Sequence, residues 1–131
     1  METLQPDGWP RPKGYANGVA ARGRTLWVAG QIGWDPVTGQ VVSDNFAAQV
    51  RQALVNLTAV LRTGGAEPHH LVRLTWYITD RSAYLGAQRE IGQMYREVLG
   101  KNFPAMSVVV VDGLIEKRAK VEIEATAVIP D

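Results

Sequence analysis

Two segments of the chain carry a single apolar stripe at helical spacing, and these stripes limit how the rest can fold. The first stripe, at spacings of four, four, three and four residues, consists of Phe46, Val50, Leu54, Leu57 and Leu61. The second, at spacings of three, four, three and four, consists of Tyr84, Ala87, Ile91, Met94 and Val98. A helix with one apolar stripe buries that side only. Two such helices can cover one face of a sheet and leave the other face to water or to a partner chain.

Capping residues indicate where the two helices begin and end. Ser43 or Asp44 can accept hydrogen bonds from the first free N–H groups of the first helix, and the glycine pair 64–65 ends it. Asp80 is the corresponding cap of the second helix, and Gly100 ends it. The sequence therefore predicts one helix between residues 44 and 64 and one continuous helix between residues 80 and 100.

Segments rich in branched and aromatic residues predict the strands. We expect them at residues 15–21, 25–32, 71–79, 105–111 and 119–129, with a tight turn at Gly23 and Arg24 joining the first two in a hairpin. Residues 1–14 hold three prolines and two glycines, so we expect an extended lead-in that forms no element. The order of elements is strand, strand, helix, strand, helix, strand, strand, which is an α+β fold.

The expected strand at residues 105–111, AMSVVVV, is almost entirely apolar. A strand that is apolar on both sides is typical of burial on both sides. Because two helices cover only one face, we expect the other face to pack against further subunits. Trp27, in the middle of its strand, is expected in the core, whereas Trp9 and Trp34 lie in loops and could wall either a pocket or an interface.

Composition excludes several classes of protein. Fourteen Lys and Arg against thirteen Asp and Glu give a formal charge of +1, without the basic excess typical of non-specific nucleic-acid binding. The absence of cysteine excludes disulfides, thiolate metal sites and cysteine nucleophiles. No apolar stretch approaches the length of a membrane span, and the N-terminus lacks the pattern of a signal peptide. We expect one cytoplasmic domain over residues 1–131.

Glu122 and Glu124 are the most informative polar residues. They lie two apart on an expected strand, so they share one face at a separation of roughly 6–7 Å. Carboxylates on a partly buried face repel each other and lose hydration, which suits one of them to general acid or base work. The alternative is that both pair with Arg or Lys across an interface, and the residues alone leave the two interpretations open.

Other polar residues carry weaker signals. His69 and His70 are adjacent and have no third ligand at a metal-like spacing, which favours a structural role over a metal site. Gly30 and Gly33 do not lead from a strand into a helix, so they do not indicate a dinucleotide loop.

The run FPAMSVVVVDGLIEKRAKVEIEATAVIP resembles the P-A-R-S strand, Leu and V-E-I-E-A strand of the RidA/YjgF family. GYANGV resembles G-P-Y-x-x-G-V, and VAGQIGWDPVTG resembles S-G-Q-I-x-x-x-P-x-T-G. AAQVRQALVNLTAVLRTGGA resembles the first helix, and LVRLTWYITD the following strand with its capping Asp. Together the motifs cover residues 15–129.

The resemblance implies a six-stranded mixed sheet with two helices on one face, similar to the chorismate-mutase-like fold. It also implies a homotrimer with a cleft between each pair of adjacent subunits. The family's activity is hydrolysis of reactive enamines and imines to a carbonyl compound and ammonia. The resemblance implies no cofactor and no metal.

Carried over residue by residue, the resemblance assigns Tyr15 to the substrate pocket, Gly30 to the backbone lining of the site, and Glu122 to the positioning or activation of water. Gln88 falls near a helix position that is usually Asn, and Val108 stands where some relatives carry a pocket cysteine.

Two residues depart from the pattern. Ala29 stands where the deaminases have Ser, and Met106 where they have the arginine that clamps the substrate carboxylate. Methionine cannot imitate that bidentate fork.

Three explanations for Met106 remain open. The substrate lacks a free carboxylate, or masks it, and meets Met106 as an apolar wall, with Trp9 or Trp34 contacting a larger or cyclic molecule. Alternatively, another arginine enters the cleft, with Arg11, Arg73 and Arg89 as candidates. Or the cleft has lost hydrolase activity and serves only to bind a small ligand. We favour the first because Tyr15 and Glu122 remain.

The residues suggest a mechanism and argue against one alternative. We expect Glu122 to hold water against an imine carbon and to act as base, with Tyr15 orienting the substrate. Ribonuclease or translation-inhibitor activity, attributed to some relatives, is disfavoured by the +1 charge and by the lack of a basic stripe.

Overall fold

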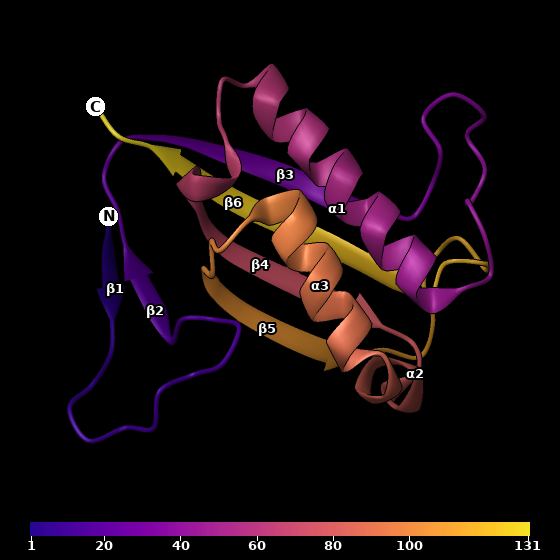
Figure 1. Ribbon diagram of the computed structural model, residues 1–131. Helices are drawn as coiled ribbons and strands as arrows, with labels where there is room; N and C mark the ends of the chain where they lie inside the picture. Colours follow the sequence, from indigo (N-terminus) through magenta and orange to yellow (C-terminus); the bar gives the residue numbers. More distant parts are fainter.

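The four longest strands pair in the order β3-β6-β4-β5 in the computed structural model, which describes all residues from 1 to 131 (Figure 1). They span Arg24–Ile32 (β3), Leu71–Ile78 (β4), Ala105–Val110 (β5) and Val121–Ile129 (β6). β6 pairs antiparallel with both β3 and β4, and β5 joins β4 in parallel. The expected strands at residues 71–79, 105–111 and 119–129 are confirmed to within two residues at their ends.

Helices α1 (Phe46–Thr63) and α3 (Gln88–Leu99) lie side by side on one face of this sheet (Figure 1). The expected stripe of α1 is buried along its whole length and forms part of a core of 19 buried residues. Asn45, rather than Ser43 or Asp44, caps α1 by accepting a 2.8 Å hydrogen bond from the Ala48 N–H. The α+β class with two helices on one face is confirmed.

The second helical segment is not one continuous helix. It divides into α2 (Arg81–Gly86) and α3, with Ala87 between them at φ −112° and ψ 15°. Asp80 caps α2 as expected by accepting from the Ala83 N–H, and Gly100 ends α3. The break directly follows Gly86, which has a low helix propensity. The apolar stripe is continuous in the sequence, but the helical backbone is interrupted at Ala87, within the stripe.

The N-terminal segments correct two expectations. Glu2–Leu4 forms a strand, β1, inside the expected lead-in, and it pairs antiparallel with β2 (Gly18–Ala20). β2 therefore does not form a hairpin with β3. At Gly23 a side-chain carbon would lie 2.0 Å from the Ile129 carbonyl oxygen, so the chain at this point is already packed on the end of β6.

The six strands accordingly form a four-stranded sheet and a separate two-stranded one, rather than the single six-stranded sheet that the resemblance implies. The bridge between Ala16 and Ala105 connects the segment before β2 to the edge of β5. There the Ala16 N–H donates to the Pro104 carbonyl at 2.9 Å. A short 3-10 turn at Pro68–His70 leads into β4.

The face of the sheet opposite the helices is open, and it carries Trp27. This side chain is 77% exposed, so its expected place in the core is wrong. β3 places Val28 on the helix side, where it is buried, and the alternation of a strand then directs Trp27 to the other side. The apolar residues of β5 are also half-exposed in the single chain.

Gln49 fixes the segment that leads into β6. Its buried side chain donates to the Ser43 carbonyl at 2.8 Å and the Arg118 carbonyl at 3.0 Å, and accepts from the Lys120 N–H at 2.8 Å. Substitution Gln49→Leu leaves these three backbone groups without that partner, and we expect the free energy of unfolding to fall by about 2–4 kcal/mol. Urea denaturation measures the change.

The matched control is Gln93→Leu on α3. Its side chain is exposed, and we expect a change below about 0.5 kcal/mol. A loss below about 1 kcal/mol for Gln49→Leu would mean that water replaces the three hydrogen bonds.

Candidate active site

Glu122 lies on β6 on the open face of the sheet, opposite Ile32 of β3 and Tyr77 of β4. Its carboxylate rests over the backbone of β3: a side-chain carbon added to Gly30 would lie 2.4 Å from Glu122 Oε2. The register of β3 against β6 shifts between Val28 and Gln31, which places Gly30 in an irregular stretch of the strand. Gly30 thus provides the space that the Glu122 side chain occupies.

Substitution Gly30→Ala should displace the Glu122 carboxylate. The added methyl group and an oxygen cannot both occupy positions 2.4 Å apart, and the side chain moves more easily than the backbone. We expect catalytic turnover to fall by about tenfold or more, with a loss of stability of about 1 kcal/mol or less. Activity assays together with urea denaturation measure both effects.

Gly86→Ala is a suitable comparison, because nothing lies within 4 Å of the added carbon. Unchanged turnover in Gly30→Ala would show that the position of the carboxylate over β3 has no catalytic importance.

Glu122 and Glu124 share the open face but differ in their contacts. The Tyr77 hydroxyl donates a 2.6 Å hydrogen bond to Glu124 Oε1, and this bond raises the pKa of the Tyr77 phenol. Glu122 accepts no hydrogen bond and forms no ion pair within the chain. Glu124 is therefore engaged by its own subunit, whereas both oxygens of Glu122 are available to a ligand or to a partner chain.

Trp34 lies near the same end of β3 as Glu122. Its indole N–H donates to Gln31 Oε1 at 3.3 Å, and its carbonyl accepts from the buried Asn56 amide at 2.8 Å. Gly30, Trp34 and Glu122 form what we call the Glu122 group. None of the five main cavities of the single chain is lined by Gly30, Trp34 or Glu122.

The other four residues assigned to the substrate form a second group. A cavity of about 360 Å³ is lined by Tyr15, Gln88, Met106 and Val108, together with Lys13, Gly14 and Tyr84. Tyr15 comes from the loop before β2, Gln88 from the start of α3, and Met106 and Val108 from the edge strand β5. We call these four residues the Met106 group.

The two groups lie on opposite sides of the sheet. Met106 pairs with Leu74, and Val108 with Trp76, both of which are buried on the helix side. Glu122 pairs with Tyr77 on the open side. β5 is also two strands away from β6, which is roughly 10 Å at the usual strand spacing. Within one chain the two groups do not face a common small substrate.

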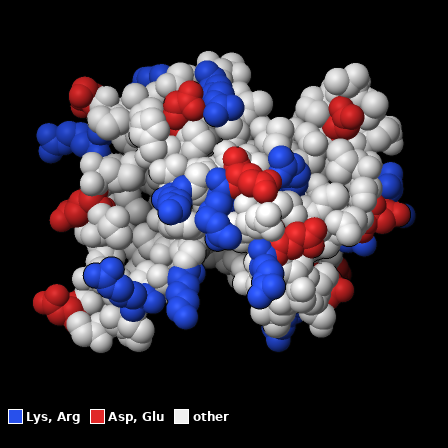
Figure 2. All heavy atoms as spheres, viewed as in Figure 1, with Lys and Arg blue, Asp and Glu red and all other residues white.

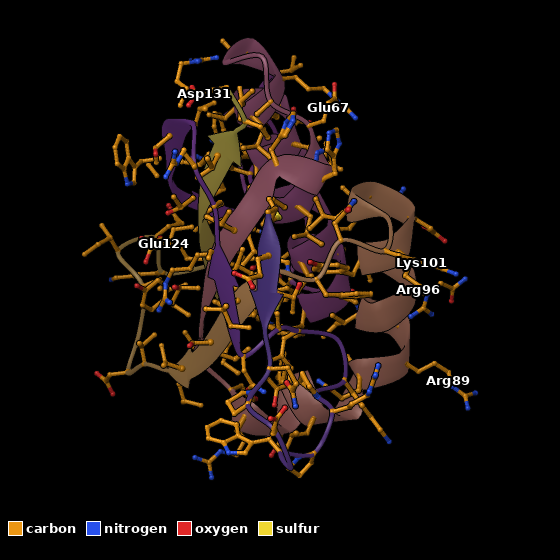
Figure 3. The ribbon with its side chains drawn as sticks, turned by 90° about the vertical axis from the view of Figure 1, so that its left-hand side faces the viewer. Glu67, Arg89, Arg96, Lys101, Glu124 and Asp131 are labelled. Carbon is orange, nitrogen blue, oxygen red and sulfur yellow. The ribbon has the colours of Figure 1, made fainter.

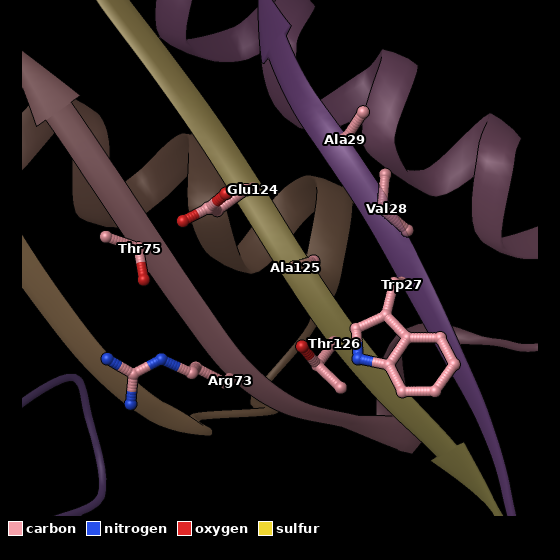
Figure 4. Close-up of a pocket in the computed structure, with 8 residues that line it drawn as sticks. All are labelled: Trp27, Val28, Ala29, Arg73, Thr75, Glu124, Ala125 and Thr126. Carbon is pink, nitrogen blue, oxygen red and sulfur yellow. The ribbon is translucent and has the colours of Figure 1, made fainter.

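The three candidate arginines fall in different places. Arg73 projects on the open face, in a hollow of about 500 Å³ that it shares with Trp27, Ala29 and Glu124 (Figure 4). Arg11 lines a hollow of about 390 Å³ beside Tyr15. Arg89 is exposed on α3 and lines neither cavity beside Met106.

Sequence reasoning missed the positive charges that do lie near Met106. A second cavity of about 220 Å³ adjoins the first and includes Lys13 and Arg96. Gln88, Gly92 and Arg96 recur every four residues and line that cavity together from α3. This spacing was a signal in the sequence that could have identified Arg96, whereas nothing marked Lys13.

Comparison with known proteins decides the family. The model of the family "Endoribonuclease L-PSP" matches residues 10–129. The chain belongs to this family. Human 2-iminobutanoate/2-iminopropanoate deaminase is 33% identical over 105 residues, which cover 80% of this chain and 73% of the human protein. A RutC family protein of Pyrococcus horikoshii is 32% identical over 96% of both chains. The family expected from the motifs is confirmed.

Solved structures of the family share the fold. The Rid family protein YyfB of Yersinia pestis, described as of unknown function, superimposes with a TM-score of 0.86 at 33% identity and covers 98% of both chains. The YjgF gene product of E. coli gives a TM-score of 0.69 at 32% identity.

Two classes of site find no support in the structure. No three His, Cys, Asp or Glu side chains come together as a group that could hold a metal ion. None of the helices combines the length and the apolar character needed to cross a bilayer. On the face that carries the helices, positive and negative side chains are interspersed (Figure 2).

Proposed function

We propose that this protein hydrolyses a reactive enamine or imine to a carbonyl compound and ammonia. The observation that carries the proposal is the Glu122 carboxylate, which lies over Gly30 and makes no hydrogen bond to its own chain. Glu124, two residues further along β6 on the same face, accepts a hydrogen bond from Tyr77. Of these two carboxylates, only that of Glu122 therefore lacks a partner in its own chain. The deaminase activity named for the human relative supports the same reaction class.

The reaction needs no group beyond water and the side chains. The enamine first tautomerises to the imine. The imine nitrogen takes a proton from solvent, and Glu122 holds a water molecule against the imine carbon and takes a proton from it as the carbon–oxygen bond forms. Glu122 then returns this proton to the nitrogen of the resulting carbinolamine. Ammonia leaves, and the hydroxyl group releases its proton to solvent as it becomes the carbonyl. Imine plus water thus gives carbonyl plus ammonia, and Glu122 ends in its starting state.

The active unit in this proposal is a homotrimer with a cleft between adjacent subunits. Placing the Met106 group of one chain against the Glu122 group of the next would complete a site that a single chain divides between two faces. Burial in such an assembly also accounts for Trp27, whose large apolar side chain is 77% exposed in the single chain.

The substrate in this proposal has no carboxylate on its reacting carbon. Met106 offers an apolar, flexible wall where an arginine clamp would hold such a group. Within the single chain none of the three arginines considered from the sequence lines this cavity: Arg73 is on the open face, Arg11 lines a different hollow, and Arg89 lines neither cavity. A masked or cyclic imine fits the apolar wall better than a 2-imino acid.

The experiment compares two imines that are generated in solution. A flavin amine oxidase produces an imine without a carboxylate, and a flavin amino-acid oxidase produces a 2-imino acid. We expect the protein to accelerate ammonia release from the first imine at least tenfold more than from the second. The reason is that no arginine pairs with the carboxylate of the 2-imino acid, and such a pair is worth roughly 1.5–3 kcal/mol. If the protein accelerates the hydrolysis of neither imine, the proposal is overturned.

A further inference from the structure

A cavity of about 220 Å³ lies between α3 and β5, next to the cavity of the Met106 group. The two cavities share Lys13, Gly14, Tyr84, Gln88 and Met106. The apolar part of the new cavity is formed by Trp76, Ile91, Tyr95, Phe103 and Met106. Aromatic and aliphatic walls with a few polar groups are typical of small-molecule sites.

Two cations on this cavity have no partner. Lys13 and Arg96 both line it, and none of its lining residues is an acid. The three ion pairs of the chain are Arg51–Glu97, Arg62–Glu67 and Arg118–Asp44, so neither cation is engaged in one. Glu124 lies on the other side of the sheet from α3 and Arg96 (Figure 3). The cavity therefore carries a local positive charge in a protein whose overall charge is only +1.

The helix leaves room for the guanidinium group. Arg96 Nη1 lies 3.5 Å from the point where a side-chain carbon on Gly92 would stand, so Arg96 folds back along α3 beside this glycine. Gly92 is itself a lining residue and adds no side chain to the space. Glycine inside a helix is destabilising relative to alanine, and here it keeps the cavity beside Arg96 open.

The wall of the cavity also contains an unsatisfied donor. Trp76 is 2% exposed, and its indole N–H is buried without any hydrogen-bond partner. Tyr84 packs edge-on against this indole ring, with 6.4 Å between ring centroids, and it lines both cavities. Because Trp76 lines the cavity, its indole N–H signal reports on an occupant.

We propose that this cavity binds an amphipathic carboxylate. The apolar body lies among Trp76, Tyr95 and Phe103, and the carboxylate meets Lys13 and Arg96 at the mouth. Met106 and Gln88 line both cavities, so an occupant of this cavity also reaches the proposed active site. Identifying that occupant as the substrate rests on the proposed function. The substrate class is an enamine or imine whose carboxylate is remote from the reacting carbon.

The test uses phenoxyacetate and its neutral counterpart phenoxyacetamide as probes. Both are titrated into the ¹⁵N-labelled protein at low salt, and the indole N–H signal of Trp76 is assigned by its loss in Trp76→Phe. We expect both probes to shift this signal, with the acid binding at least tenfold more tightly than the amide.

Charge variants locate the carboxylate. Arg96→Gln should weaken binding of phenoxyacetate by about tenfold, and Lys13→Gln should weaken it in the same direction. Arg89→Gln makes the same charge change on the same helix at an exposed position outside the cavity, and it should leave the affinity unchanged. Because Lys13 and Arg96 are exposed, these variants should fold normally.

Equal affinity for acid and amide, absence of binding up to about 10 mM, or an Arg96→Gln variant that binds like the parent would overturn the proposal. Ammonia release is measured separately. Binding with no turnover of any imine supports the cavity and refutes the deaminase. Turnover without a preference for the acid refutes the cavity and leaves the deaminase standing.

Discussion

Substitution of Glu122 by Gln is expected to lower the rate of imine hydrolysis by about 10²–10⁴-fold. The amide has nearly the same shape and can still hold water, but it cannot take a proton from it. Because Glu122 makes no hydrogen bond within its own chain, the substitution breaks no contact of the folded subunit. We therefore expect the melting temperature to change little. Ammonia release from imines made in solution measures the catalytic loss.

Glu124→Gln is the matched control for this experiment. It makes the same chemical change two residues further along β6, on the same face. Glu124 already accepts a hydrogen bond from Tyr77, which an amide oxygen can also accept. We expect turnover within about threefold of the parent. Equal losses of turnover in the two variants would show that the charge of the open face matters and not the position of Glu122. Undiminished turnover in Glu122→Gln would refute the role of Glu122 as base.

The pattern of β6 and the stripe of α1 could be predicted from the sequence because each has one unambiguous period. Residues 121–127 alternate, so the placement of Glu122 and Glu124 on one face follows directly. In β3, by contrast, apolar residues occupy both sides of the strand, and the pattern alone could not direct Trp27 inward or outward. Only the packing of α1 on β3 settles which side is buried.

Long-range pairing was the part of the fold that could not be predicted. Gly23 meets Ile129, and Ala16 meets Ala105, so the ends of β3 and β2 are fixed by residues 106 and 89 positions away. No local signal reports such contacts, and a glycine between two apolar segments is typical of a hairpin. The same limit explains β1, a three-residue strand that exists because β2 is free to pair with it.

In the candidate site, too, individual residues could be predicted from the sequence, whereas their arrangement in space could not. The family resemblance assigned residues to one pocket without stating which chain each residue comes from. The structure separates them by the side of the sheet on which they lie. Arg96 and Lys13 were not predicted as site residues because only tertiary packing brings α3 and the N-terminal segment to one cavity beside Met106.

A mixture of two inactive variants should recover activity if the site lies between chains. One variant is Glu122→Gln, and the other carries Tyr15→Ala with Gln88→Ala, which removes two side chains of the Met106 group and with them the orientation of the substrate. When the two chains assemble at random in equal amounts, about one cleft in four combines an intact Met106 group with an intact Glu122 group. Activity should then rise to about a quarter of the parent value, from about one hundredth or less in either variant alone.

The decisive comparison pairs Glu122→Gln with Gly30→Ala. Both changes fall in the Glu122 group, on β6 and β3 of the same face, so no mixed assembly can contain an intact copy of that group. This mixture should show no gain over the average of its two components, whatever the geometry of the oligomer. If the first mixture also shows no gain although both chains co-assemble, the two groups do not meet across an interface. Since the sheet separates them within one chain, they would then not form a common site at all.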